Sequence, residues 1–298
     1  MFFCRQCKPM KLHWLAFAML SLFVIFLLVG RDEELASHRT PAASAAAAQA
    51  ASSSPSPPAA LGSRLSAAVR PSCVPLPSAE WKGSGMTFSQ HELDARMKKY
   101  LTGTHGTYIE SGAFDGKTAS NTYIYAAQRC WTGLLVEPSV GNAAAAAANR
   151  PTDVVEHSAL VGPDFAGATI RGAFHNDLMS KVDGAGDVEV PAHTITALLE
   201  KNRVEHVHWW SLDVEGFEMD VLRGLDFARW TPDYILLELW NNSSAVKDFL
   251  AGKGYSIIAD ISPWSHITPH RDVVFRSATA LSRQPEDPSF TTDHLPSY

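Results

Sequence analysis

The stretch YIESGAFDG, residues 108–116, decides the fold of this chain. A short apolar run ends in the carboxylate of Glu110, and two glycines, Gly112 and Gly116, follow it. This order is typical of a buried parallel strand that runs into a tight turn, where glycine lets the backbone approach a nucleotide-like ligand. Three segments farther along the chain fall where such a fold needs them.

Predicted strands and helices alternate on both sides of this stretch. The predicted strands are residues 108–111, 133–138, 153–157, 207–213 and 234–239, and the predicted helices are residues 91–101, 118–127, 142–149, 194–202, 217–225 and 244–251. Residues 162–191 indicate an inserted hairpin or irregular loop, and residues 255–261 and 272–275 indicate a closing pair of strands. The alternation predicts an α/β fold with a mostly parallel sheet covered on both faces, and the closing pair predicts an antiparallel edge hairpin. This is the layout of the Rossmann-like class I methyltransferase fold.

The N-terminal part of the chain has a different composition. An uncharged apolar run, WLAFAMLSLFVIFLLV, follows Arg5, Lys8 and Lys11. It predicts a transmembrane signal anchor with a cytoplasmic N-terminus, although a cleaved signal peptide stays open as an alternative. We therefore expect a single-pass type II protein of the endoplasmic reticulum or Golgi with a lumenal domain. The predicted parts are a cytoplasmic tail (1–13), the anchor (14–30), a disordered Ala/Ser/Pro-rich stem (31–79), the folded domain (80–283) and a disordered tail (284–298).

Charge and cysteine content exclude some partners and fit this topology. The net charge of −6 over 298 residues gives no basic face for nucleic acid. Cys4 and Cys7 precede the anchor, where S-acylation is a reasonable expectation. A bridge between Cys73 and Cys130 stays open, but we expect Cys130 to be a buried thiol. Residues 241–244 contain two overlapping glycosylation sequons, usable in a secretory lumen.

Three predicted strands end in acids, namely Glu110, Glu137 and Asp213. In open α/β sheets, ligands bind outside the carboxyl ends of the strands, so these carboxylates should surround one site. Glu137 is placed to accept hydrogen bonds from the two hydroxyls of a ribose. Residues 112–118 do not complete a P-loop, and no G-x-G-x-x-G is present, so a cationic ligand without phosphates fits better. S-adenosylmethionine is such a ligand, and Glu110 with its turn should meet the amino-acid end.

Three motifs together resemble the FkbM-type methyltransferase family. They are ESGAFDG with SNT at 110–122, GLLVEP at 133–138 and SLDVEGFE at 211–218. The resemblance extends from about Gly106 to Phe275, and it implies a Rossmann-like fold that uses S-adenosylmethionine, typically for O-methylation of sugar-containing or similar small molecules. It places Asp213 and Glu215 near the point of methyl transfer. It assigns to the cofactor side Glu110, Gly112, Phe114, Asp115, Gly116, Asn121, Glu137 and His157.

Several residues keep two interpretations. Asp213 and Glu215 suit a general base or a magnesium site, or else one of them caps the helix predicted from Phe217. Glu238 either faces the substrate or is a structural carboxylate. His206 and His208 invite a metal interpretation, but the sequence shows no third ligand, and we expect ordinary histidines and no metal site.

Two functions from different classes follow from these observations. The first is an S-adenosylmethionine-dependent methyltransferase, acting on a hydroxyl of a glycan or another small molecule, on a secretory-pathway anchor. The second is a non-catalytic trafficking protein that binds protein cargo, because the motifs joined to an anchor and a stem also resemble the Star-type membrane proteins. A nicotinamide-dependent enzyme is a third possibility, which the missing G-x-G-x-x-G disfavours.

Overall fold

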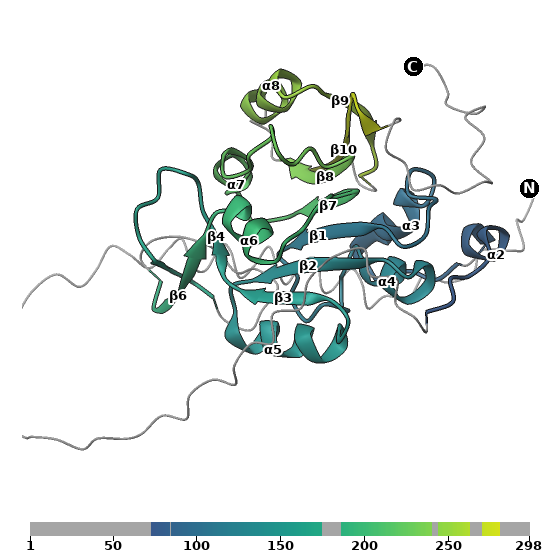
Figure 1. Cartoon of the computed structure of the whole chain (residues 1–298), viewed down its shortest axis with the longest axis horizontal. Coiled ribbons are helices and arrows are strands. Elements are labelled where there is room, and N and C mark those ends of the chain that lie inside the picture. The colour runs from purple at the N-terminus through teal and green to yellow at the C-terminus, as the bar shows by residue number, and fades with distance from the viewer. Residues whose placement is uncertain (1–72, 84, 175–185, 240–243, 263–269, 281–298) are drawn as a thin grey trace, which may run out of the picture. The chain divides into compact units, whose positions relative to one another are not determined.

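The computed structural model describes residues 73–83, 85–174, 186–239, 244–262 and 270–280. These residues form a seven-stranded sheet with the strand order β3-β2-β1-β7-β8-β10-β9 (Figure 1). The strands are β1 (Thr107–Ser111), β2 (Thr132–Glu137), β3 (Val154–His157), β7 (Trp209–Leu212), β8 (Tyr234–Leu239), β9 (Tyr255–Asp260) and β10 (Arg271–Ser277). The first five strands of the sheet are parallel, and β10 runs antiparallel between β8 and β9. The predicted mostly parallel sheet with an antiparallel edge hairpin is confirmed.

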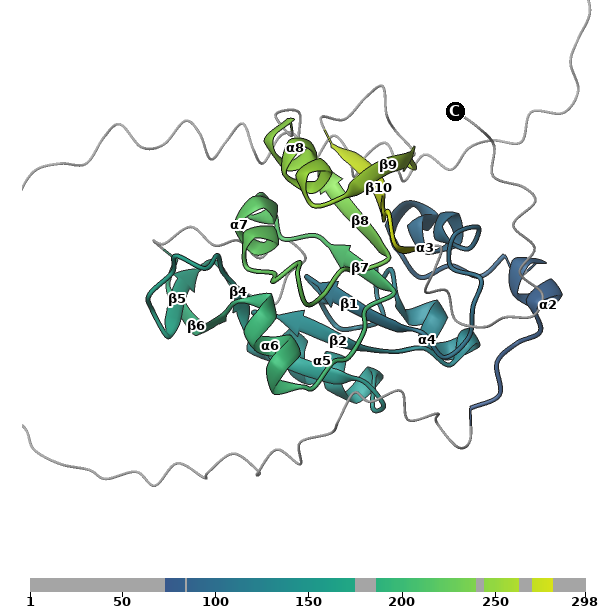
Figure 2. The ribbon, with the colours of Figure 1, turned by 45° about the horizontal axis from the view of Figure 1, so that its top comes forward.

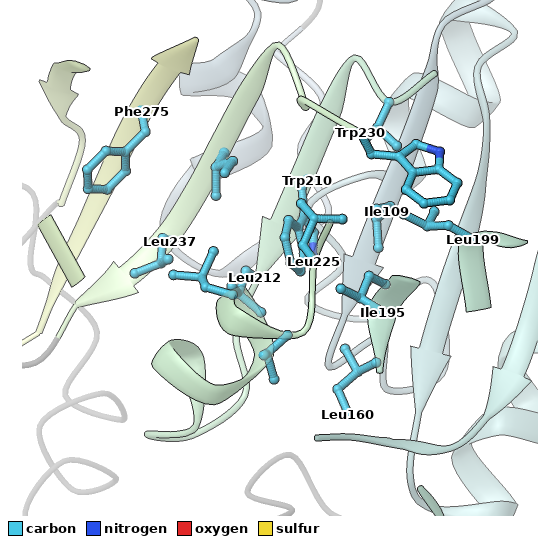
Figure 3. Packing of buried hydrophobic residues seen from close by; sticks show 14 of the residues in the cluster. Ile109, Leu160, Ile195, Leu199, Trp210, Leu212, Leu225, Trp230, Leu237 and Phe275 are labelled. Carbon is cyan, nitrogen blue, oxygen red and sulfur yellow. The ribbon is translucent and has the colours of Figure 1, made fainter. Parts of the chain in front are cut away.

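Side chains alternate along the strands, and the two faces of the sheet therefore bury different cores. Tyr108 and Trp209 pack on one face, and their neighbours Ile109 and Trp210 pack on the other. Figure 3 shows the second face, where Ile109, Trp210 and Leu237 follow one another across neighbouring strands. The first face packs against helices α2 (Ser78–Gly83), α3 (Leu93–Met97), α4 (Tyr123–Arg129) and α5 (Val140–Asn149), and the second against α6 (Ile195–Lys201), α7 (Glu218–Arg223) and α8 (Ser244–Gly252).

A second, three-stranded sheet is inserted after β3. It has the order β4-β6-β5 and comprises β4 (Ala159–Leu160), β5 (Thr169–Gly172) and β6 (Val188–His193) (Figure 2). The antiparallel pairing of β5 with β6 confirms the predicted hairpin. Ala159, Phe174 and Val190 form its own small core, so the insertion can hold side chains against the end of the main sheet.

Four predicted helices are shorter in the structure than in the prediction, and two of them have a clear physical cause. The helix predicted over 118–127 begins only at Tyr123, because Ser120, Asn121 and Thr122 donate hydrogen bonds to the Glu110 carboxylate instead of entering the helix. The helix predicted over 91–101 is reduced to a 3-10 turn, η1 (Gln90–Glu92), and α3. The positive φ angles of His91 (56°) and Glu92 (60°) separate these two pieces.

Cys73 and Cys130 form a disulfide, with 5.8 Å between their Cα atoms, which corrects the expectation of a buried thiol at Cys130. Cys130 is the left-handed C-cap of α4, and the chain from Cys73 runs along this helix end. The Leu76 amide donates to the Gln128 carbonyl at 2.8 Å, and Arg129 donates to the Leu76 carbonyl at 2.6 Å. The segment expected at the end of the stem is therefore attached to the domain from residue 73 onward.

The predicted anchor (14–30), the rest of the N-terminal region up to residue 72, both sequons and the tail from 284 lie outside the described residues. Within the part of the chain that the structure describes, no helix has the length and apolar character needed to cross a membrane.

Candidate functional site

A cavity lies at the carboxyl ends of β1, β2, β7 and β8. Its volume is about 1150 Å³, including the space at its open mouth. Its walls come from the β1 turn, from Glu137 and Pro138, from residues 158–160, from the turn after β7, and from Glu238 and His270. The inserted sheet adds Phe174. Segments distant in the sequence meet here because parallel strands all end at the same edge of the sheet.

The turn after β1 brings the backbone close to its neighbours. Gly112 has a φ of +80°, and a Cβ atom at this position would lie 2.2 Å from the Asp213 carbonyl oxygen. The amides of Gly112 and Ala113 donate to the Val136 carbonyl at 3.1 and 3.2 Å. The turn is therefore fixed against both β2 and the β7 turn, and only glycine fits its first position.

Glu137 lines the cavity at the end of β2 and is almost fully buried. Its carboxylate accepts hydrogen bonds from the Phe114 and Ser139 amides, both at 2.9 Å. Burial raises the pKa of Glu137 to about 7, although these two amides and the Asn142 side chain favour the ionised form. Glu137 thus connects the glycine turn to the start of α5 and presents a fixed acceptor to the cavity.

Glu110 does not line the cavity, so its expected contact with the amino-acid end of the cofactor has no support in its position. Its buried carboxylate accepts hydrogen bonds from Ser120 Oγ at 2.8 Å, the Asn121 amide at 2.7 Å and Thr122 Oγ1 at 2.7 Å. Arg150 lies 3.8 Å away. Burial raises the pKa of Glu110 in spite of this guanidinium. Through these hydrogen bonds, Glu110 fixes the loop between β1 and α4 without lining the cavity.

Four other predicted cofactor residues have mainly structural contacts. Asp115 accepts hydrogen bonds from the Lys117 and Thr118 amides at 2.9 and 2.6 Å, and Asn121 donates to Ser211 Oγ at 2.9 Å. Gly116 has a φ of +73°, and its carbonyl accepts a hydrogen bond from Arg150 at 2.8 Å. His157 Nε2 lies 2.9 Å from the Pro138 carbonyl oxygen. These four residues do not line the cavity, whereas the predicted residues Gly112, Phe114 and Glu137 do.

Asp213, Glu215 and Glu238 face the cavity from the ends of β7 and β8. Desolvation, and then repulsion from Glu215, Glu218 and Asp272, raise the pKa of Asp213 above its usual value, and the exposure of its side chain to water in the open cavity limits the desolvation part. Burial and the same group of acids raise the pKa of Glu238 to about 8. Asp213 and Glu238 therefore retain protons to a higher pH than isolated carboxyl groups do, and a positive charge placed beside them would oppose this shift.

The helix-cap interpretation of Asp213 and Glu215 is not supported. Helix α7 begins at Glu218, its N-cap is Phe217, and this cap has no side-chain hydrogen bond. Glu218 itself accepts from the Gly216 amide at 2.9 Å. Asp213 and Glu215 line the cavity and do not cap α7.

His270 is a lining residue that sequence reasoning missed. Its Nδ1 atom lies 2.9 Å from a Glu238 carboxylate oxygen. His270 directly precedes β10, and local sequence gives no signal that β10 inserts next to β8. Phe174 was missed for the same kind of reason, since it belongs to the inserted sheet.

His206, His208 and Asp233 come together at the other end of β7, where Asp233 is the third group that the sequence did not show. His206 Nε2 lies 3.0 Å from Asp233, but His208 Nδ1 accepts the Thr107 amide at 3.0 Å. Burial, and then His206, lower the pKa of His208 to about 3, so its ring is neutral. With the Nδ1 lone pair engaged, Nε2 carries the proton, and His208 has no lone pair to give to a metal ion.

The comparisons with known proteins agree with this geometry. Residues 110–257 match the family described as Methyltransferase FkbM domain. A protein named Methyltransferase 1 from Beauveria bassiana (strain ARSEF 2860) is 32% identical over 84 residues. That alignment covers 26% of this chain and 34% of the fungal protein, so the chain spans about a third of this relative.

The chain's own residues also fit the cofactor that this family implies. The Gly112 turn leaves no room for a side chain, and Glu137 offers a carboxylate fixed by the Phe114 amide. On the opposite side of the cavity, the neighbouring carboxyl groups around Glu238 would be stabilised by a positive charge. The chain carries a methyltransferase domain of the FkbM family.

Proposed function

We propose that this protein is an S-adenosylmethionine-dependent methyltransferase whose cavity holds the nucleoside over β1 and β2 and the acceptor near β7 and β8. The observation that carries the proposal is the position of Glu137. Its carboxylate lies at the end of β2, lines the cavity and is fixed by the amide of the glycine turn, 2.9 Å away. A carboxylate at this place in an open α/β sheet accepts hydrogen bonds from the hydroxyls of a ribose.

The residues divide into three roles. Gly112 and Phe114 would let the backbone pass close to the cofactor, and Glu137 would bind its ribose. Asp213 and Glu215 would lie beside the acceptor and accept its proton. The bound cofactor supplies an electrophilic methyl group on a positively charged sulfur. The protein contributes the alignment of the acceptor oxygen with that methyl group and the exclusion of water.

We further propose a hydroxyl of a glycan or another small molecule as the acceptor. The carboxylates of Asp213, Glu215 and Glu238 can accept hydrogen bonds from hydroxyl groups, and Phe174 and Phe217 supply apolar surface in the same cavity. This combination of apolar walls and few polar groups suits a polyhydroxylated molecule better than an anionic one.

The location remains a proposal too, namely a type II membrane protein with its domain in the lumen of the endoplasmic reticulum or Golgi. The apolar run at residues 14–29 and the Cys73–Cys130 disulfide both support it. Disulfides persist in oxidising compartments such as the secretory lumen and are rare in the cytosol. A lumenal enzyme would need a transporter to supply the cofactor.

Isothermal titration of the full-length chain in mild detergent tests the enzymatic proposal. We expect S-adenosylmethionine and S-adenosylhomocysteine to bind, and transfer of a labelled methyl group to neutral glycosides to follow. If neither nucleoside releases heat or shifts the melting temperature, the enzymatic proposal is wrong. The non-catalytic Star-like role with a protein cargo would then be the better explanation of the same domain.

A further inference from the structure

Arg150 lies directly behind one wall of the cavity. It follows the last residue of α5, its exposed fraction is only 2%, and it does not line the cavity. The loop between β1 and α4 contributes Phe114, Thr118 and Ala119 to the lining. Gly116 of the same loop packs so closely on Arg150 that a Cβ atom at Gly116 would lie 2.9 Å from Arg150 Cγ. A ligand in the cavity would thus contact a loop whose other side packs on Arg150.

Every N–H group of the Arg150 guanidinium has an acceptor. A guanidinium has five N–H donors in one rigid plane. Its Nε donates to Asp153 Oδ2 at 2.7 Å, and its two terminal nitrogens donate to one backbone carbonyl and three hydroxyl groups. These acceptors are the Gly116 carbonyl at 2.8 Å, Ser120 Oγ at 3.3 Å, Thr122 Oγ1 at 3.0 Å and the Tyr108 hydroxyl. A lysine has three donors on one nitrogen and cannot make the same set of contacts.

The three hydroxyl groups connect Arg150 to two buried carboxylates. Each hydroxyl accepts from Arg150 and gives its own proton to an acid, so its donor and acceptor capacities are used without conflict. The proton of Tyr108 goes to Asp153 at 2.7 Å, and those of Ser120 and Thr122 go to Glu110 at 2.8 and 2.7 Å. The loop after β1 is therefore attached to Arg150 both directly and through Glu110.

Ala119 shows why this loop needs support. It lines the cavity with a φ of 58°, in the left-handed region. This region is unfavourable for a residue with a Cβ atom and persists where surrounding contacts impose it. Arg150 binds the chain on both sides of Ala119, at the Gly116 carbonyl and at Ser120 Oγ, and a bridge to Ser89 adds a third contact. The conformation of this part of the wall thus depends on the guanidinium.

We propose that Arg150 is a positioning residue of the cofactor site, which holds the loop between β1 and α4 in its binding conformation before S-adenosylmethionine arrives. This inference rests on the proposed function. Without the guanidinium the loop would adopt other conformations, and the apparent affinity falls with the fraction of molecules in the binding conformation. Because Arg150 does not line the cavity, its loss should weaken S-adenosylmethionine and S-adenosylhomocysteine by the same factor.

Arg150→Lys is the first test, because it keeps the positive charge and removes the planar set of donors. We expect both nucleosides to bind roughly tenfold more weakly, the loss that follows if the binding conformation falls to about a tenth of the molecules. Isothermal titration of the full-length chain in mild detergent measures both affinities, at a temperature where circular dichroism shows the variant to be folded.

Arg129→Lys is the matched control for a loss of stability alone. Arg129 is also fully buried and donates to the carbonyls of Leu76, Thr102 and Gly103, but it lies at the other end of α4 from the loop. This variant should lower the melting temperature and leave both affinities unchanged.

Hydrogen exchange distinguishes positioning from stability in a second way. The Gly116 amide donates to the Ala113 carbonyl at 2.8 Å, and the Asn121 amide donates to Glu110 at 2.7 Å, so both should be protected in the wild type without cofactor. In Arg150→Lys, residues 113–122 should lose most of this protection while the amides of β1 and β2 keep theirs. Added S-adenosylmethionine should restore the protection of the loop. Faster exchange over the whole sheet, with no recovery in the loop, would show a structural role only and would overturn the inference.

Thr122→Val tests the same network if Arg150→Lys does not fold. It keeps nearly the same shape and removes only the hydroxyl between Arg150 and Glu110. We expect both nucleosides to bind roughly threefold more weakly, as for a binding conformation reduced to about a third of the molecules. Thr231→Val is its control, because it removes a hydroxyl that donates to the Phe227 carbonyl at 3.0 Å and lies outside the cavity lining.

The inference and the proposed function can fail separately. If folded Arg150→Lys or folded Thr122→Val binds both nucleosides as the wild type does, the loop does not need the guanidinium and only the inference is wrong. A loss of affinity for one nucleoside alone would also overturn it, because a positioned loop affects both. If the wild type binds neither nucleoside, the proposed function fails and the inference fails with it.

Discussion

Glu137 is the single residue on which cofactor binding should depend most. Among the described residues that line the cavity, its carboxylate is the only acidic group at the end of β2, and Glu137→Gln keeps its shape while removing its charge. Charge-assisted hydrogen bonds contribute about 1.5–3 kcal/mol, so we expect both S-adenosylmethionine and S-adenosylhomocysteine to bind roughly 10–100-fold more weakly. Isothermal titration measures this change, and Glu80→Gln is the control.

The pH dependence gives a second test of the same residue. Because burial raises the pKa of Glu137 to about 7, the affinity for both nucleosides should increase as the pH rises through 7 and the carboxylate ionises. Glu137→Gln should remove this shared increase. An unchanged affinity in the variant would show that the ribose is bound elsewhere.

For single residues, the prediction from the sequence was confirmed where the local position in a strand alone determines where the side chain points. Glu137 could be assigned from its place after an apolar run, because the end of a strand points to the ligand edge. Glu110 also follows an apolar run, but its carboxylate accepts hydrogen bonds from Ser120 and Thr122. These hydrogen bonds cross the loop after β1, and the local sequence around Glu110 does not predict them. Glu238 and His270 meet through strand pairing alone, and no local pattern encodes that pairing.

The turn between β1 and α4 is the element that should tolerate substitution least. Gly112 combines a φ of +80° with a Cβ position 2.2 Å from the Asp213 carbonyl oxygen. Gly112→Ala should therefore lower the free energy of unfolding by more than about 2 kcal/mol and abolish cofactor binding. Urea unfolding followed by circular dichroism measures the first effect.

Gly252 provides the matched control for this prediction. It ends α8, and a Cβ atom there would meet nothing within 4 Å. Gly252→Ala should be neutral or stabilising by up to about 1 kcal/mol, because alanine favours the helix. Equal effects of the two substitutions would contradict the role assigned to the turn.

The same loop shows why element boundaries were harder to predict than elements. Residues 118–122 have helical neighbours and no proline, so their sequence favours a helix. Arg150, far along the chain, donates to the Gly116 carbonyl at 2.8 Å and to Thr122 Oγ1 at 3.0 Å and keeps these residues out of it. Such long-range hydrogen bonds outweigh helix propensity, which is small for each residue.

For the whole molecule, the Cys73–Cys130 disulfide closes a long loop, with a sequence separation of 57. A loop of this length corresponds to about 4 kcal/mol in the chain-entropy account. Cys73→Ser should lower the melting temperature and expose the segment around Trp81 to proteolysis. A reducing agent should reproduce this effect in the wild type and add nothing in the variant, and an unaffected melting temperature would contradict the prediction.

The raised pKa values of the site acids also affect the stability of the whole chain. An acid whose pKa is higher in the folded than in the unfolded state binds more protons when folded, so the free energy of unfolding falls as the pH rises between the two values. For Asp213, Glu137 and Glu238 this range extends from about 4 to about 8.

Without cofactor, the melting temperature should therefore fall by on the order of a few degrees between pH 6 and pH 8.5. The double variant Asp213→Asn, Glu238→Gln should flatten this decline, and scanning fluorimetry over the pH series measures it. A melting temperature that rises over this range would show that other groups dominate.

Because β1 lies at the centre of the sheet, the two sides of the cavity come from two separate parts of the chain. The lining residues on the side proposed for the nucleoside all precede residue 161 in the sequence, whereas Asp213, Glu215, Glu238 and His270 all follow residue 208. Recombination that replaces only the later stretch would leave the nucleoside pocket intact and present it with a new partner molecule. A hybrid of two such chains joined between α6 and β7 should inherit its methyl donor from the first parent and its choice of acceptor from the second.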